Sequence, residues 1–272
     1  MTPSSATPRE RRARFFELHA RDGVFVMPNP WDVGSAKLLA GAGFEALATT
    51  SAGFAWSIGK DDQQVTRDEL VAHARTLASA TDLPLNVDSE RCYADDLAGV
   101  AETVGLLHEA GAAGCSIEDY DPGTRAIDPI AVAAERVAAA AAAAHVADDP
   151  MMLTARCENF LYGITDLDDT ILRLRAYRDA GADCVYAPGL STTGQIQAVV
   201  DGVGIPVNVL IWPGGPSVAE IAAAGGRRVS TGGALASTAY GALMIGAHEL
   251  LSAGTSAYRA ISLRPEDRAA LR

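Results

Sequence analysis

The chain has 272 residues, of which 49% are hydrophobic and 21% charged, which is typical of a folded chain and excludes a disordered one. Its net charge of −12 disfavours nucleic acid as a partner, and no run of about 20 apolar residues predicts a membrane span. The four cysteines lie far apart without a Cys-x-x-Cys pair, and residues 1–14 lack the apolar stretch of a secretory signal. We therefore expect a cytoplasmic protein.

Short apolar segments recur along the chain roughly every 29 residues, which is the size of a strand plus a helix. Most are apolar at successive positions, a pattern typical of parallel strands that are buried on both faces. The predicted strands are Val24–Pro28, Ala46–Ser51, Pro84–Asp88, Gly114–Asp119, Met151–Glu158, Cys184–Pro188, Pro206–Ile211 and Arg228–Gly232.

Helical patterns fill the intervals between these strands, and Gly follows many of their ends. The clearest are Arg67–Thr81, Asp95–Ala112, Pro129–Ala144, Asp168–Ala182, Ser217–Ala224 and Thr238–Ala253, and Thr7–Arg21 predicts an additional N-terminal helix. This alternation predicts a single (β/α)8 barrel domain over residues 1–272. A doubly wound open sheet is the alternative, but no G-x-G-x-x-G follows the first strand.

Polar residues gather at the predicted strand ends, where barrels of this class carry their active sites. Asp88, Glu90 and Glu118 follow two neighbouring strands, so their carboxylates are expected to repel one another unless a cation balances them. Without a matching His or Cys cluster, oxygen ligands favour Mg²⁺ or Mn²⁺, held largely through water. The alternative is that some of these acids only cap the following helices.

Arg156 ends the fifth strand and is expected to face the acidic residues, where it can hold a substrate carboxylate. Alternatively, Arg156 only pairs with Glu158 or Glu118. Thr50 and Ser51 offer hydroxyls and backbone N–H groups for an anion. The histidines in helices, His19 among them, are expected on the outer ring, so we predict no catalytic histidine.

Several motifs in order resemble the isocitrate lyase/phosphoenolpyruvate (PEP) mutase superfamily over nearly the whole chain. They are Pro28-Asn29-Pro30-Trp31-Asp32, Thr49-Thr50-Ser51-Ala52-Gly53, Gly59-Lys60-Asp61-Asp62, Asp88-Ser89-Glu90-Arg91-Cys92-Tyr93, Ser116-Ile117-Glu118-Asp119, Ala155-Arg156-Cys157-Glu158 and Arg228-Val229-Ser230-Thr231-Gly232.

The resemblance implies a Mg²⁺-dependent barrel that acts on small 2-oxo or 2-hydroxy carboxylates through an enolpyruvate-like intermediate. It implies a metal set of Asp62, Asp88, Glu90 and Glu118, and substrate contacts from Thr50, Ser51, Ala52, Arg156 and Asn208. Asp62, Arg156 and Glu158 are the predicted catalytic residues. It also implies a homo-oligomer, a dimer or tetramer, in which the C-terminal helix is exchanged between subunits.

Two departures from the family pattern bear on the activity. Glu90 stands where the D-x-D-x-G-Y pattern has its second Asp, and the longer side chain can still reach a metal-bound water. The gating loop of the isocitrate and methylisocitrate lyases carries K-K/R-C-G-H, whereas residues 120–129 contain no Cys, His or Lys. They also lack the Lys-x-Asn of the phosphonomutases, although Pro122 and Gly123 suit a lid hinge.

These features favour a metal-dependent C–C lyase, with decarboxylase-like chemistry ahead of isocitrate cleavage. Decarboxylation of an oxo acid needs no nucleophile, whereas a retro-aldol cleavage needs a base, for which Glu158, Tyr93 and Tyr120 are candidates by position. One alternative is a P–C bond enzyme, such as a phosphonomutase or phosphonopyruvate hydrolase. Another is a non-catalytic barrel that binds a carboxylate.

Overall fold

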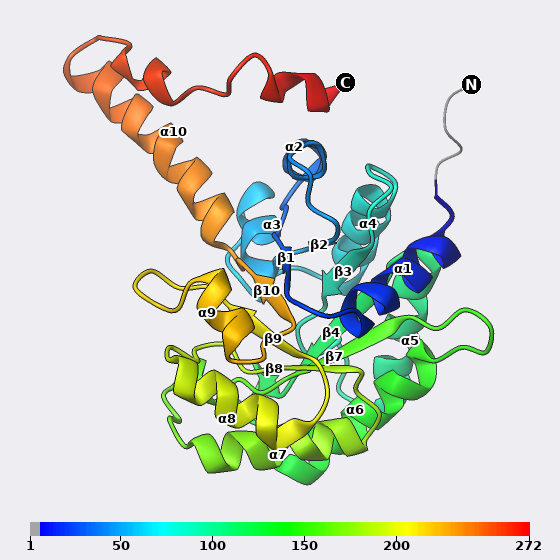
Figure 1. Cartoon of the computed structure of the whole chain (residues 1–272). Helices are drawn as coiled ribbons and strands as arrows, with labels where there is room; N and C mark the ends of the chain where they lie inside the picture. The colour runs from blue at the N-terminus through cyan, green and yellow to red at the C-terminus, as the bar shows by residue number, and fades with distance from the viewer. Residues whose placement is uncertain (1–5) are drawn as a thin grey trace.

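The computed structural model describes residues 6–272, in which eight parallel strands form one sheet surrounded by helices (Figure 1). The sheet runs in the order β1-β10-β9-β8-β7-β4-β3-β2. Its two edges meet where the Ala48 N–H donates to the Pro28 carbonyl at 3.0 Å and the Asn29 amide donates to the Thr49 carbonyl at 2.7 Å. The sheet is thus a nearly closed TIM-type barrel, which confirms the predicted class over the doubly wound alternative.

All eight predicted strands are present, although the structure makes each of them one or more residues shorter. They are β1 Phe25–Met27, β2 Leu47–Ala48, β3 Leu85–Asp88, β4 Gly114–Glu118, β7 Met152–Arg156, β8 Cys184–Tyr186, β9 Val207–Leu210 and β10 Arg228–Ser230. The predicted domain of residues 1–272 includes residues 1–5, which lie outside the described part of the chain.

Helices cover the outside of the barrel between successive strands. They are α2 Val33–Gly41, α3 Ser51–Ser57, α4 Arg67–Ala78, α5 Leu97–Glu109, α6 Ile130–Ala144, α7 Leu167–Asp179, α8 Thr193–Val203 and α9 Val218–Ala223, and α10 Ala234–Ser252 follows the last strand. Two further features were not predicted. Residues 51–57, which lie outside the predicted helices, form α3, and the Thr50 hydroxyl accepts the Gly53 N–H and caps this helix. A small hairpin of β5 Tyr120–Asp121 and β6 Ala126–Ile127 follows β4.

The strands are buried on both faces, but the two faces differ in chemistry. Alternate residues such as Val87, Ile117 and Leu153 belong to the apolar core that packs under the helices. Their neighbours Asn86 and Ser116 line a cavity inside the barrel instead. The interior of this barrel is therefore largely polar at its carboxyl end, which successive apolar residues did not predict.

Helix α1 Pro8–Ala20 covers the opposite, amino-terminal end of the barrel. Its Phe15 and Leu18 share a second core cluster with residues at or near the strand starts, among them Phe25 and Met152. The prediction that His19 lies on the outer ring is wrong. His19 is buried against the barrel floor, where its Nε2 is 3.2 Å from Nη1 of Arg228.

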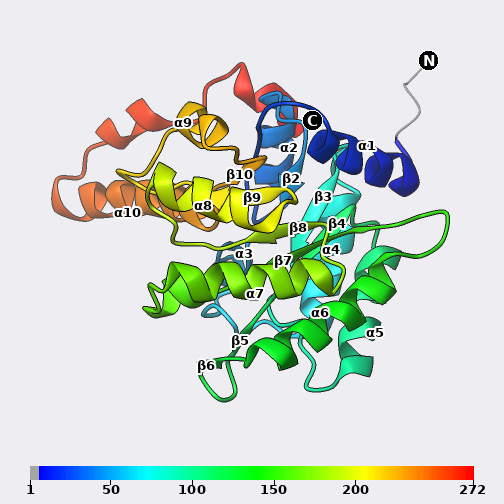
Figure 2. The same cartoon turned by 60° about the horizontal axis from the view of Figure 1, so that its bottom comes forward.

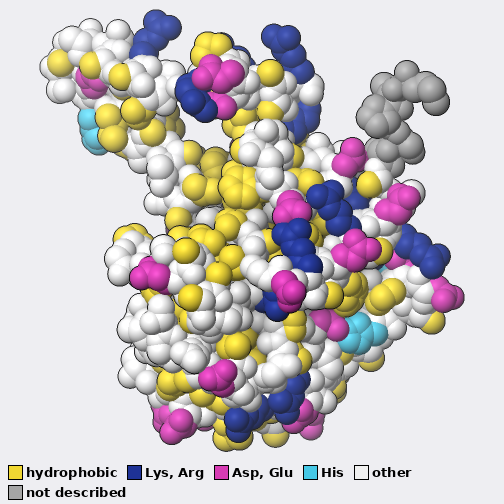
Figure 3. Space-filling view, viewed as in Figure 1, with side chains coloured by type: hydrophobic (Ala, Val, Ile, Leu, Met, Phe, Trp, Pro, Cys, Tyr) yellow, Lys and Arg dark blue, Asp and Glu magenta, His cyan; other side chains and the backbone are white. Residues whose placement is uncertain are grey.

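Helix α10 projects away from the barrel, and the chain then returns through the short helices η2 Ala257–Ile261 and η3 Asp267–Leu271 to α2 (Figure 1). The return is close-packed, because any side chain at Gly41 of α2 would collide with the Ala270 methyl group. Several apolar side chains of the projecting arm remain exposed, including Leu243 at 65% and Leu251 at 87% (Figure 3). No helix within residues 6–272 combines the length and apolar character that crossing a bilayer requires.

Candidate active site

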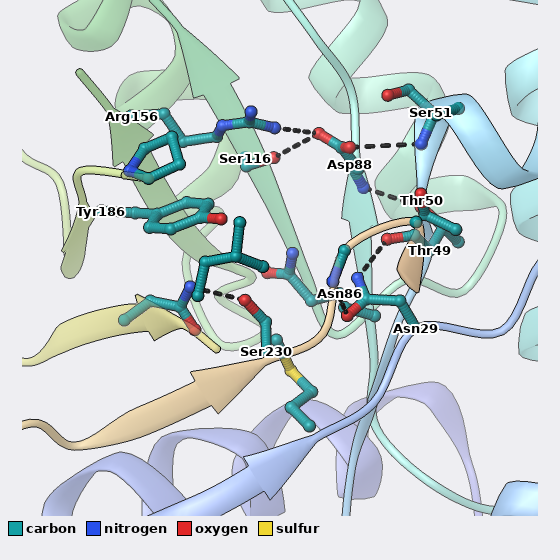
Figure 4. Close-up of a pocket in the computed structure, with 18 of the residues that line it drawn as sticks. Asn29, Thr49, Thr50, Ser51, Asn86, Asp88, Ser116, Arg156, Tyr186 and Ser230 are labelled. Carbon is teal, nitrogen blue, oxygen red and sulfur yellow. Dashed lines mark hydrogen bonds and ion pairs between the residues drawn. The ribbon is translucent and has the colours of Figure 1, made fainter. Parts of the chain in front are cut away.

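A cavity of about 160 Å³ opens at the carboxyl end of the barrel, where the strand-end rule predicts the active site. Its walls come from residues of all eight barrel strands and from the loops that follow them (Figure 4). Such a volume is well below the roughly 300–1,000 Å³ of sites that take drug-sized ligands. The cavity therefore suits an acid of a few carbon atoms.

Arg156 at the end of β7 holds three carboxylates at once. Its Nη1 lies 2.6 Å from Asp88 Oδ1, its Nε 2.8 Å from Glu158 Oε1 and its Nη2 3.3 Å from Glu118 Oε2. The guanidinium also lies 5.2 Å from the ring centroid of Tyr186. Pairing with Glu118 and Glu158 was the alternative prediction for Arg156, and the structure adds the contact with Asp88.

Asp88 is the acidic residue most firmly placed in the cavity wall. Besides Arg156, its carboxylate accepts from the Ser51 N–H and the Ser116 hydroxyl, both at 3.2 Å (Figure 4). Its own N–H donates to the Thr49 hydroxyl at 2.8 Å. Residues of α3, β4 and β7 thus fix one carboxylate in a single orientation.

Glu90, Glu118 and Glu158 lie behind the cavity wall rather than on its surface. Burial raises the pKa of Glu90 to about 7, although the Tyr93 hydroxyl donates to this carboxylate at 2.6 Å. Burial also raises the pKa of Glu118 well above its usual range, even though Arg156 opposes this. Glu158, a predicted catalytic residue, is buried beside Arg156, so its observed contact is with that side chain.

The loop after β3 is held in a strained backbone conformation. Glu90, Cys92 and Tyr93 have φ values of 47°, 61° and 51°, in the left-handed region that favours glycine. Cys92 occupies the position of the glycine in the family pattern and is fully buried. The buried Cys92 side chain and the Tyr93–Glu90 hydrogen bond hold this left-handed backbone in place, although none of the three residues is a glycine.

The other predicted site residues line the cavity directly. Asp62 faces it from the loop after α3, and its pKa is raised by burial and by the nearby Asp88. Thr50, Ser51 and Ala52 line it at the first turn of α3. Asn208 also lines it, but its amide is already engaged with Arg228 and Ser230 at 2.8 and 2.9 Å.

The acidic side chains fit a hydrated divalent cation better than a fully enclosed one. Within residues 6–272, no three Asp, Glu, His or Cys side chains form a group arranged to hold a metal ion. However, Asp62 and Asp88 face the cavity. Together with Glu90, Glu118 and Glu158 behind the wall they form an acidic cluster of five carboxyl groups, and Arg156 is the cation in contact with it. All-oxygen ligands with this surplus of negative charge suit Mg²⁺ or Mn²⁺ bound partly through water.

Two loops meet beside the cavity mouth through aromatic stacking. The rings of Tyr120, which begins the β5–β6 hairpin, and Tyr162 are 3.8 Å apart and nearly parallel. Leu161, in the same short helix η1 Asn159–Tyr162, lines the cavity. The hairpin lies at the end of the molecule away from α1 (Figure 2). This stack gives the loop of residues 120–129 a contact with the cavity wall, as a lid requires.

Sequence reasoning missed several residues that line the cavity, namely Asn29, Asn86, Ser116, Tyr186, Arg228 and Ser230. Most occupy alternate positions on strands, at two-residue spacing from a predicted site residue or from one another. Ser116 precedes Glu118, and Asn86 precedes Asp88, by two residues, so each pair projects to the same face of its strand. Counting back from the strand ends in steps of two would have found Asn86, Ser116 and Arg228.

Comparison with known proteins agrees with this site. The pattern of the phosphoenolpyruvate phosphomutase family matches residues 15–251. A crystal structure of a Burkholderia cenocepacia J2315 protein described as a lyase/mutase is 48% identical, with a TM-score of 0.92 over 96% of this chain and 95% of that one.

Two curated relatives carry more specific names. The oxaloacetate decarboxylase of Paraburkholderia xenovorans is 30% identical over 77% of this chain and 70% of its own length. A Corynebacterium glutamicum protein named “Probable 2-methylisocitrate lyase 2” is 30% identical over 75% of this chain and 67% of its own length. With a family match over most of its residues, a TIM-type barrel and an acidic strand-end site, the chain belongs to the phosphoenolpyruvate phosphomutase family of the isocitrate lyase/PEP mutase superfamily.

Proposed function

We propose that this protein is a Mg²⁺-dependent lyase that cleaves a C–C bond of a small 2-oxo or 2-hydroxy carboxylate, with oxaloacetate-type decarboxylation as the favoured reaction. The observation that carries the proposal is the cavity wall, where Nη1 of Arg156 lies 2.6 Å from Asp88 Oδ1, with the Asp62 carboxylate in the same wall. A guanidinium for a carboxylate and carboxylates for a hard cation are the two elements that binding a chelating oxo acid needs.

Arg156 is the proposed anchor of the substrate carboxylate. Its guanidinium contacts Asp88, Glu118 and Glu158, and of these three acids only Asp88 lines the cavity. A substrate carboxylate would therefore bind by exchanging with Asp88 at Nη1, while Glu158 and Glu118 keep the guanidinium in place. Ser51 and Ala52, at the first turn of α3, would orient the oxo group from the opposite wall.

Asp62, Asp88, Glu90 and Glu118 are the proposed cation site: Asp62 and Asp88 line the cavity, and Glu90 and Glu118 behind its wall would act through bound water. Mn²⁺ is an alternative to Mg²⁺. When bound, the cation would withdraw electrons from the oxo group and balance the developing enolate oxygen. The protein residues then bind and orient the acid, and Leu161 together with the Tyr120–Tyr162 stack restricts water.

Loss of CO₂ is favoured over retro-aldol cleavage because none of the three predicted bases, Glu158, Tyr93 and Tyr120, lines the cavity. The Tyr93 hydroxyl hydrogen-bonds to Glu90, Glu158 is held by Arg156, and the Tyr120 ring stacks on Tyr162. The loop of residues 120–129 contains no Cys, His or Lys. A decarboxylation requires no proton abstraction from carbon before the enolate forms.

Product identification distinguishes this reaction from P–C chemistry, the second candidate that the family membership supports. Oxaloacetate and phosphonopyruvate would each be incubated with the Mg²⁺-loaded protein, and the products followed by NMR. We expect pyruvate and CO₂ from oxaloacetate and no reaction of phosphonopyruvate. Turnover of phosphonopyruvate alone would replace the proposal with P–C bond cleavage, and tight binding without turnover of either acid would favour a non-catalytic carboxylate-binding barrel.

We also propose a homo-oligomer, dimer or tetramer, that buries the projecting α10. Leu243, Ile245 and Leu251 expose apolar surface that a second copy would cover by exchange of this helix. A cytoplasmic location is proposed as well, since the four cysteines are all free and buried, as a reducing compartment permits.

A further inference from the structure

Arg228 is a fully buried cation at the floor of the active-site cavity. Its side chain, from the first residue of β10, is 2% exposed and is among the largest fully buried ones in residues 6–272. Its guanidinium contacts three groups: the Asn208 amide oxygen at 2.8 Å, the Thr154 hydroxyl at 3.0 Å and His19 Nε2 at 3.2 Å.

None of these partners balances the charge of Arg228. Nδ1 of His19 contacts the Phe15 carbonyl, so this nitrogen carries the ring proton and Nε2 is the acceptor. Burial and the neighbouring Arg228 lower the pKa of His19 to about 3, so the imidazole is neutral at pH 7. No ion pair among residues 6–272 involves Arg228, whereas a buried charge is ordinarily paired.

The cavity reaches this unpaired guanidinium. Arg228, Asn208 and Ser230 line the same cavity as Arg156 and Asp88. Thr154, which Arg228 contacts, precedes Arg156 by two residues on β7, so it lies on the same face one layer lower, about 6.6 Å along the strand. The cavity thus has acidic residues and Arg156 at its mouth, and a second cation one layer below.

We propose that Arg228, with Asn208 and Ser230, forms a second anion subsite, which takes the far acid group of a dianionic substrate whose first carboxylate binds Arg156. This inference rests on the proposed function and narrows its substrate to acids with two anionic groups a few atoms apart. The chemistry is shared by a dicarboxylate and a carboxy-phosphonate, because either acid group can accept from a guanidinium. A monocarboxylate would leave the Arg228 charge without a partner.

The test compares acids that the protein does not turn over, so that it does not depend on activity. Succinate and butyrate have the same carbon chain and differ by one carboxylate, and phosphonoacetate supplies the phosphonate. Calorimetric titration of the full chain in Mg²⁺ buffer would give the affinity for each acid. The variants are Arg228→Gln and the matched control Arg227→Gln, in which the lost guanidinium instead contacts the Gly23 carbonyl outside the cavity at 2.7 Å.

We expect the unmodified protein and Arg227→Gln to bind succinate or phosphonoacetate at least about 10-fold more tightly than butyrate. Arg228→Gln should bring these affinities within about two-fold of each other without weakening butyrate. If succinate binds more tightly than phosphonoacetate, the second acid group is a carboxylate, and if phosphonoacetate binds more tightly, it is a phosphonate.

Equal affinities for succinate, phosphonoacetate and butyrate in the unmodified protein would overturn the inference without any variant. So would an unchanged preference in a folded Arg228→Gln protein. If circular dichroism shows that Arg228→Gln does not fold, Arg228→Lys takes its place. We then expect the preference for the diacids over butyrate to fall by at least about three-fold, and an unchanged preference would contradict the subsite. A protein without turnover that still prefers diacids would refute the lyase proposal but keep this subsite.

Discussion

The Arg156 guanidinium lies 2.6 Å from the Asp88 carboxylate, although the two residues are on strands separated by β4 and 68 positions apart in the chain. Because Glu118 and Glu158 hold the same guanidinium from behind, Asp88 is the partner on the cavity side. Arg156 would bind a substrate carboxylate, and Asp88 would bind a cation beside it.

Replacing Arg156 with Lys tests the anchor. Lysine keeps the positive charge that the acidic cluster needs but cannot contact three carboxylates as a planar fork does. We expect a folded protein whose kcat/KM for the oxo acid falls by about 100-fold or more, measured by steady-state kinetics. The control is Arg178→Lys, a partly exposed residue paired with Asp179, which should retain activity. An Arg156→Lys protein with unchanged kcat/KM would refute the anchoring role.

Replacing Glu90 with Gln tests the cation site. Glutamine can still accept from the Tyr93 hydroxyl but loses the negative charge. We expect Mg²⁺ affinity, measured by titration calorimetry, to fall by at least about 10-fold, as for other changes to the surroundings of a bound metal. Glu102→Gln, which removes an exposed carboxylate paired with Arg67, serves as the control. If both Mg²⁺ affinity and turnover are unchanged in Glu90→Gln, the assignment of the acidic cluster is wrong.

The buried His19 predicts how stability changes with pH. Its pKa falls from 6.5 in the unfolded chain to about 3 in the fold, so the unfolded chain binds the extra proton between these values. The stability that neutral His19 contributes is complete above pH 6.5 and is lost as the pH falls towards 3, by up to about 1.4 kcal/mol per pH unit.

Urea unfolding of the unmodified protein and of His19→Gln isolates this contribution, because other titrating groups act equally in both. Glutamine retains an acceptor for Arg228. The difference in the free energy of unfolding between the two proteins should shrink by about 1.4 kcal/mol for each pH unit between 6 and 4. A difference that is independent of pH would show that His19 is not held neutral.

The exposed arm of α10 predicts the assembly state. Leu243→Glu and Leu251→Glu place charges on side chains that are 65% and 87% exposed in the single chain, so they should disturb only an interface with another copy. We expect each to reduce the mass measured by light scattering, whereas Leu172→Glu on α7, at 55% exposed, should leave it unchanged. If the unmodified protein is monomeric, the proposed oligomer is incorrect.

The barrel was predictable because most of the predicted strands are short apolar segments at regular spacing and Gly follows many helix ends. The rim residues followed from the same pattern, since Asp88, Glu118 and Arg156 lie within the last three residues of predicted strands and end the observed ones. The structure adds that all three belong to one connected cluster.

Other features depend on contacts between distant residues, which a local pattern does not encode. Arg228 and His19 are 209 positions apart, and their pairing requires the barrel to close over α1. The β5–β6 hairpin escaped prediction because its strands have two residues each, too few for any periodic signal. Cys92 lies only four residues past Asp88 at the rim, yet the turn there buries it completely.

The central claim is that the oxygen-lined cavity binds a divalent cation which makes an oxo acid reactive. The most direct test is turnover of a panel of C3–C6 oxo and hydroxy acids, oxaloacetate included, by EDTA-treated protein before and after Mg²⁺ is restored. We predict no turnover without the cation and recovery with it for at least one diacid. Turnover that survives EDTA, or no turnover of any acid with Mg²⁺ present, would contradict the claim.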